Sequence, residues 1–131
     1  MVYDNPMPMV SDAPTAYEGQ PGFDFIRQVL TSWDETRVLS GQVGDYIVVA
    51  RRKGSDWFLG AMTDWTARVL EVPLSFLAAG RYQIESWADA ADSEDPNRLT
   101  YEKRKAEPGE KLVLRLGSGG GQAVRIQPLK E

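Results

Sequence analysis

The stretch Tyr46–Thr63, YIVVARRKGSDWFLGAMT, has the composition of a β-hairpin. Its first part, Tyr46–Ala50, is aromatic and β-branched, and strands favour such residues. Lys53–Asp56 contains glycine, serine and aspartate, which are typical turn residues. Trp57–Thr63 then has the pattern of a returning strand. The stretch therefore predicts two antiparallel strands that are neighbours in the fold.

Further strands are predicted downstream of this hairpin, between clusters of Gly, Pro, Asp and Asn. Their segments are Thr66–Val72, Gly80–Ala88, Arg98–Lys103, Glu110–Leu116 and Gln122–Gln127. No long helix is predicted between them, so a parallel sheet with crossover helices is not expected. The predicted fold class is mainly β: an antiparallel β-sandwich of seven or eight strands, preceded by a short helical N-terminal segment.

Residues 1–30 differ from the rest of the chain because they are rich in proline. Within them, Phe23, Ile26, Val29 and Leu30 follow a helical spacing, and Pro21 suits the first turn of a helix. We therefore expect two parts, a helical or irregular segment at 1–30 and a β-sandwich at 31–131.

The composition excludes several classes of function. The 131 residues are enough for one domain, and they contain neither cysteine nor histidine. Cysteine nucleophiles, disulfides and histidine bases are therefore excluded. A net charge of −4 argues against nucleic acid as a partner. No apolar run is long enough to span a bilayer, so no membrane partner is expected. The basic cluster Arg51–Lys53 is either a solvated hairpin end or a phosphate site.

Asp34 and Glu35 are adjacent carboxylates beside Trp33, which raises the question of a glycosidase pair. Such a pair stands roughly 5–10 Å apart across a sugar ring and normally comes from different elements. Neighbours on a strand point to opposite faces and cannot converge in this way. We therefore predict a structural role for all three residues and assign no catalytic residue in this chain.

Other candidate sites are weaker. The acidic loop Asp89–Asn97 either holds a metal such as calcium or is an exposed turn, and its spacing does not match an EF-hand. The glycine-rich Gly117–Gly121 lacks the lysine and helix of a phosphate-binding loop, so a turn is expected. Trp65 is the tryptophan most suited to glycan contact, because Thr63–Thr66 reads as a turn. A carbohydrate-binding module would need a second exposed aromatic near it, such as Tyr101.

Several segments together resemble the C-terminal region of glycoside hydrolase family 97. They are Thr31–Leu39, Val43–Gly54, Trp57–Thr63, Val72–Leu77 and Gly119–Gly121. Met1–Asp12 also resembles the end of that family's catalytic (β/α)8 barrel. Two departures are Met7-Pro8, where the family has Leu-Gln, and Leu30, where it has proline.

The resemblance implies a larger parent enzyme that hydrolyses α-glucosidic or α-galactosidic bonds and uses calcium. Its catalytic and calcium-binding residues come from parts that this chain does not contain, so no catalytic, cofactor-binding or metal-binding residue is carried over. Residues 1–30 would be the end of the barrel, and residues 31–131 the accessory C-terminal domain. A bacterial periplasmic or secreted location is implied for the parent.

The expected partner is the catalytic barrel of the same enzyme. Phe23, Ile26, Trp33, Asp34 and Glu35 are the predicted interdomain residues. Self-association through the N-terminal segment is a second expectation, because its apolar side chains would lack a partner in an isolated chain. Carbohydrate, contacted through Trp65, is the alternative partner.

Overall fold

The computed structural model describes residues 1–9, 11–90 and 98–129. Within these residues, eight antiparallel strands form two sheets, which confirms the mainly β class. The strands are β1 (Glu35–Gln42), β2 (Tyr46–Lys53), β3 (Asp56–Thr63), β4 (Arg68–Pro73), β5 (Tyr82–Asp89), β6 (Leu99–Ala106), β7 (Lys111–Leu116) and β8 (Gly121–Pro128). The six-stranded sheet has the order β1-β2-β3-β8-β5-β6, and β4 pairs with β7 in the smaller sheet.

The predicted hairpin is present as β2 and β3. Lys53 pairs with Asp56, so Gly54 and Ser55 form the turn between the strands. Gly54 has a φ of 58°, a left-handed conformation that favours glycine. The other predicted strands are found with shifted ends, and Glu35 is the first residue of strand β1.

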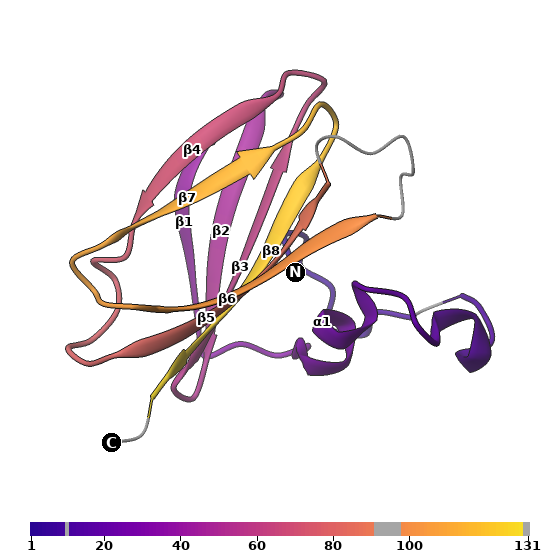
Figure 1. Ribbon diagram of the computed structural model, residues 1–131, viewed down its shortest axis with the longest axis horizontal. Coiled ribbons are helices and arrows are strands. Elements are labelled where there is room, and N and C mark those ends of the chain that lie inside the picture. Colours follow the sequence, from indigo (N-terminus) through magenta and orange to yellow (C-terminus); the bar gives the residue numbers. More distant parts are fainter. Residues whose placement is uncertain (10, 91–97, 130–131) are drawn as a thin grey trace.

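The two sheets enclose the main core. The inner face of the six-stranded sheet contributes alternate residues of its central strands, and β7 contributes Leu112, Leu114 and Leu116. The β4–β7 pair and helix α1 (Phe23–Gln28) lie on opposite sides of the large sheet (Figure 1). Burial of these apolar side chains is the main stabilising contribution to the fold.

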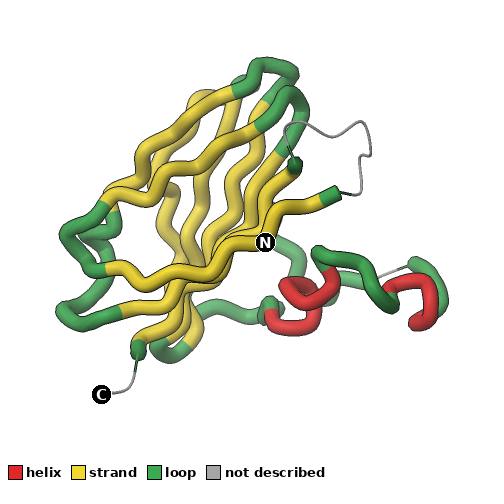
Figure 2. The backbone as a smooth tube through the Cα atoms, in the orientation of Figure 1, coloured by secondary structure: helices red, strands yellow, loops and turns green. Residues whose placement is uncertain are grey.

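Helical structure is limited to the N-terminal part of the described chain (Figure 2). It consists of α1 and one 3-10 turn at Pro14–Tyr17. The predicted helical face was expected to continue to Leu30, but α1 ends at Gln28 because Val29 has an extended backbone. A helical N-terminal segment as a folded unit therefore stays a prediction.

Candidate interdomain surface

The large sheet has an outer face that is also partly buried. This face carries Val49, Arg51, Phe58, Gly60 and Trp87, which the strand pairing places on one side. Phe25 of α1 packs there, with its ring centroid 5.3 Å from that of Trp87 and 6.3 Å from that of Phe58. A second apolar cluster thus joins α1 to the sheet. We call the side with these residues the outer face.

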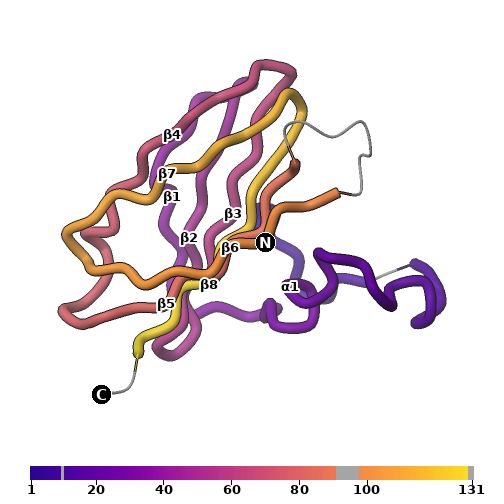
Figure 3. The backbone as a smooth tube through the Cα atoms, viewed as in Figure 1, coloured from indigo at the N-terminus to yellow at the C-terminus, as the bar shows by residue number. Residues whose placement is uncertain are grey.

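The first residues of the chain also lie on the outer face, beside the large sheet (Figure 3). A Cβ added to Gly60 would stand 2.9 Å from Cγ2 of Val2 and 3.1 Å from Cγ of Met1. Only glycine therefore allows this close approach. The side chains of Met1 and Val2 therefore pack directly over Gly60 of β3.

Arg51 fixes the same segment through hydrogen bonds. Its Nε donates to the Met1 carbonyl at 3.0 Å and Nη2 donates to the Val2 carbonyl at 3.4 Å. Nη1 lies 3.6 Å from the Asp4 carboxylate. Arg51 is buried, so a solvated hairpin end is the wrong interpretation for this residue. No local pattern indicates this burial, because the partners of Arg51 are backbone carbonyls 50 and 49 residues away in the chain.

Trp33 and its two acidic neighbours lie where the N-terminal segment enters β1. The Trp33 ring packs at 5.4 Å from Phe58 and so joins the outer-face cluster. Asp34 accepts hydrogen bonds from the Gly54 N–H at 2.8 Å and from Lys53 Nζ at 3.0 Å. It therefore ties the β2–β3 turn to the segment before β1.

Glu35 makes different contacts from those of Asp34. Its carboxylate accepts hydrogen bonds from the guanidinium groups of Arg37 and Arg52. These bonds lower the pKa of Glu35. The pKa of Asp34 is also lowered, mainly by the hydrogen bond from the Gly54 N–H and then by the hydrogen bond from Lys53. A general acid of a glycosidase needs a raised pKa instead. The arrangement is suited to bracing the strand and not to proton transfer.

The two predicted interdomain residues of α1 behave differently from Phe25. Phe23 stacks on Tyr17 with ring centroids 5.2 Å apart, and Ile26 is exposed. The structure therefore brings Trp33 into the outer-face cluster but leaves Phe23 and Ile26 outside it. Phe25 lies off the helical spacing of Phe23, Ile26, Val29 and Leu30, so this spacing did not indicate its contact with the sheet.

Trp65 lies on the turn after β3 and is 85% exposed. Ser118 donates a hydrogen bond to its carbonyl at 2.6 Å, and its ring lies over Gly119. Tyr101 instead packs 5.3 Å from Trp87 and donates to Glu85 at 2.8 Å. The two aromatics that a carbohydrate platform would need contact different parts of the fold.

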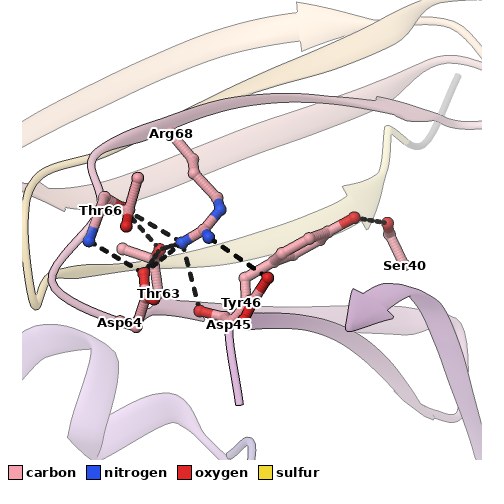
Figure 4. Close-up of polar contacts among 7 residues, drawn as sticks. All are labelled: Ser40, Asp45, Tyr46, Thr63, Asp64, Thr66 and Arg68. Atoms are coloured by element: carbon pink, nitrogen blue, oxygen red, sulfur yellow. Dashed lines mark hydrogen bonds and ion pairs between the residues drawn. The ribbon is translucent and has the colours of Figure 1, made fainter. Parts of the chain in front are cut away.

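The turn that carries Trp65 is held by Arg68, whose guanidinium gathers acceptors from two loops (Figure 4). Arg68 donates to Asp64 and Thr63 and to the carbonyls of Asp45 and Thr66. It also lies 5.3 Å from the centre of the Tyr46 ring. Arg68 and the Thr66 N–H lower the pKa of Asp64. The cluster satisfies its own charges and acts as a brace between loops.

The described part of the chain offers neither a cluster of metal ligands nor a membrane-spanning helix. No three acidic side chains there form a group that could hold a metal ion. Residues 91–97 of the acidic loop, where a metal such as calcium or an exposed turn was predicted, lie outside the described residues. None of the described helices has the length and apolar character to cross a bilayer.

The chain is similar to parts of larger enzymes. The family described as "Glycosyl-hydrolase 97 C-terminal, oligomerisation" matches residues 32–127. A retaining alpha-galactosidase of Bacteroides thetaiotaomicron is 38% identical over 129 residues, which are 97% of this chain and 20% of that protein. A probable retaining alpha-galactosidase of Streptomyces bingchenggensis is 30% identical, over 95% of this chain and 19% of that protein.

Solved structures give the same result. A glycoside hydrolase family 97 enzyme from Pseudoalteromonas sp. strain K8, in complex with acarbose, matches with a TM-score of 0.85 and 40% identity. The match covers 91% of this chain and 20% of that enzyme. A beta-arabinopyranosidase matches with a TM-score of 0.71 and 27% identity, over 88% of this chain and 18% of that enzyme. This chain thus spans about a fifth of the length of these relatives.

Proposed function

Because this chain belongs to the family of glycosyl-hydrolase 97 C-terminal domains, we propose that it is the non-catalytic accessory domain of a larger glycoside hydrolase. Its role there is to pack against the catalytic part and stabilise it. One observation supports this most: the chain matches relatives over nearly its whole length but only a fifth of theirs. Interdomain contacts of this kind typically bury roughly 600–1,500 Å².

The outer face is the surface proposed for this packing. Its apolar cluster combines Phe58 and Trp87 of the sheet with Phe25 of α1, and Met1, Val29 and Trp33 pack against this cluster. We propose that residues 1–30 are the end of the catalytic barrel and a helical preface to a β-sandwich at 31–131. Trp33, Asp34 and Glu35 would then fix the angle at which the chain enters the sandwich.

The chemistry of the parent enzyme is proposed from its relatives. Hydrolysis of α-glucosidic or α-galactosidic bonds is expected, and the calcium ion implied for the parent would bind to parts outside this chain. The arrangement of the described residues does not favour carbohydrate binding here, since Trp65 and Tyr101 do not share a platform. Calorimetric titration with starch oligosaccharides and galactosides tests that alternative, which needs measurable heat at millimolar ligand.

Self-association is a second proposed role. The description of the matched family includes oligomerisation. The N-terminal segment also exposes Tyr3, Met7 and Met9, and an apolar patch of this kind favours association. Light scattering over a concentration series distinguishes a monomer from an oligomer of the purified chain.

A domain exchange tests the accessory role. The corresponding fifth of the Bacteroides thetaiotaomicron alpha-galactosidase would be replaced by this chain, and the same segment would be deleted as a comparison. We expect the chimera to hydrolyse a nitrophenyl α-galactoside and to melt well above the deletion variant, because the outer face covers the same neighbouring surface. The purified chain alone should show no turnover. An inactive or unfolded chimera would contradict the proposed role.

A further inference from the structure

A groove of about 700 Å³ lies between the free edge of β7 and the inner face of β5 and β6. Within the described residues, β7 pairs only with β4, so the smaller sheet leaves the inner face of β6 open. Ser86, Thr100 and Glu102 form the floor of the groove, because they continue the inner face of β5 and β6. The groove and α1 lie on opposite sides of the large sheet, so the groove stays open when the outer face is covered (Figure 1).

The free edge of β7 presents backbone groups to this groove. The Leu74 N–H donates to the Glu110 carbonyl at 3.0 Å, and every second residue along an antiparallel pair makes such bonds. In the register of the two strands, the residues of β7 that bond to β4 are Leu112, Leu114 and Leu116. Val113 and Arg115 therefore point their N–H and C=O groups away from β4. An edge of this kind is a template for a further strand.

The side chain of Gln122 takes part of the place where a further strand would lie. The Arg115 N–H donates to Gln122 Oε1 at 3.1 Å, and Gln122 Nε2 donates to Ser86 Oγ at 2.6 Å. A side-chain amide carries the same donor and acceptor groups as a peptide bond. Gln122 thus supplies one of the hydrogen bonds that a neighbouring strand would make. Val113 has no such substitute among the described residues.

The charges beside the edge favour carboxylates on an incoming strand. Lys111, Val113 and Arg115 project from the exposed face of the smaller sheet. Lys111 Nζ lies 2.8 Å from Glu71, whereas no carboxylate of the described chain forms an ion pair with Arg115. Side chains of an incoming strand would alternate between the Arg115 side and the floor, next to Glu102. Carboxylates are favoured on the first side and neutral hydroxyl groups on the second.

We propose that the free edge of β7 binds an extended acidic segment of a partner protein by strand addition. Main-chain hydrogen bonds supply the affinity in this mode of recognition, and alternate side chains supply the specificity. A second copy of this chain fits less well. Antiparallel pairing of two β7 strands about Val113 would set Lys111 of each copy opposite Arg115 of the other, and like charges in such positions are destabilising.

Three peptides of about eight residues test this strand addition on the purified chain. The first alternates glutamate with threonine, the second alternates lysine with threonine, and the third is the glutamate peptide with N-methylated backbone amides. Only the first should bind, because the second lacks carboxylates and the third cannot donate main-chain hydrogen bonds. The net charge of the chain is −4, so a non-specific attraction would favour the lysine peptide instead.

Amide hydrogen exchange locates the bound peptide. At a concentration of the glutamate peptide about ten times its Kd, exchange of the Val113 N–H should slow by about tenfold, because this amide exchanges only in the unbound chain. The matched control is the Val69 N–H. Val69 lies opposite Arg115, so its N–H points to the other free edge of the smaller sheet. Its exchange rate should stay unchanged.

Two arginine variants test the role of charge. R115Q should weaken binding of the glutamate peptide about threefold to fivefold, which is the effect of losing one exposed ion pair. R81Q is the control, because Arg81 is also exposed but does not line the groove. It should leave the Kd of the peptide unchanged. Both arginines are exposed, so both variants should fold.

Four results would overturn the inference. The first is no binding of the glutamate peptide at millimolar concentration, and the second is equally tight binding of the lysine peptide. The third is a complex in which the Val113 N–H exchanges as fast as in the free chain. The fourth is a chain that dimerises and protects the Val113 N–H without any peptide, which would assign the edge to a second copy. Equal Kd values for R115Q and R81Q would contradict the acidic character of the partner.

Discussion

Arg51 links strand β2 to the first residues of the chain. Its guanidinium is on the outer face, where it donates to the carbonyls of Met1 and Val2 and lies near Asp4. A buried guanidinium without partners would be strongly destabilising, so these carbonyls satisfy a charge that the fold has enclosed. The Arg51 side chain thereby selects the path of the first residues over the sheet.

At the same scale, Asp34 predicts a dependence of stability on pH. Its pKa is lowered in the folded chain by the Gly54 N–H and by Lys53. A carboxyl with a depressed folded pKa stabilises the fold above its unfolded pKa, and this contribution is lost as pH falls through the folded value. We therefore expect D34N to lower the urea midpoint at pH 7 and to differ little from the unchanged chain at low pH.

The control for this experiment is D24N. Asp24 lies on the exposed surface of α1, 4.0 Å from Arg27. Exposed pairs of this kind contribute little to stability, so D24N should leave the urea midpoint almost unchanged at every pH. A D34N deficit that persists undiminished from pH 7 to low pH would contradict the electrostatic explanation.

At the scale of elements, the β2–β3 hairpin is the structural centre of the chain. Val48 and Ala50 face the inner core, whereas Val49 and Arg51 are buried on the outer face, where Arg51 contacts Met1 and Val2. This double burial explains why Tyr46–Ala50 is apolar throughout and does not alternate. The same hairpin thus holds both apolar layers of the molecule together.

The turn of this hairpin gives a prediction for Gly54. Its φ of 58° is unfavourable for a residue with a Cβ, and no atom lies within 4 Å of a Cβ added there. Gly54→Ala should therefore destabilise the chain by about 1–2 kcal/mol through backbone strain alone. Gly109→Ala is the matched control, because Gly109 is equally open but has no positive φ. Urea unfolding of both variants measures the difference; equal midpoints would refute the strain argument.

At the scale of the whole molecule, the N-terminal segment completes the outer layer. Removal of residues 1–31 would take away Phe25 and expose Phe58 and Trp87 on the sheet. We expect the truncated chain to lose at least about 3 kcal/mol of unfolding free energy, as for the loss of one buried phenylalanine. It should also associate, which light scattering can measure. A truncated chain that is monomeric and as stable as the full chain would show that the outer layer contributes nothing.

The fold could be predicted in part from local patterns. The two strands around Lys53–Asp56 and the alternation of Leu112, Leu114 and Leu116 were visible in the sequence, since turn chemistry and side-chain period act over a few residues. The structure places Trp33 in the outer-face cluster, and it places Asp34 and Glu35 in contacts with the β2–β3 turn and with two arginines. Their part in an interdomain contact stays a prediction.

The sequence by itself determined the mainly β class, most strand positions and the family, because these depend on local composition and on matched segments in order. Only the tertiary structure decided that β8 lies between β3 and β5, that Arg51 is buried, and that a groove remains open beside β7. Such features need contacts between residues far apart in the chain. Their formation depends on closing long loops and on packing against one particular face, and no local pattern encodes either.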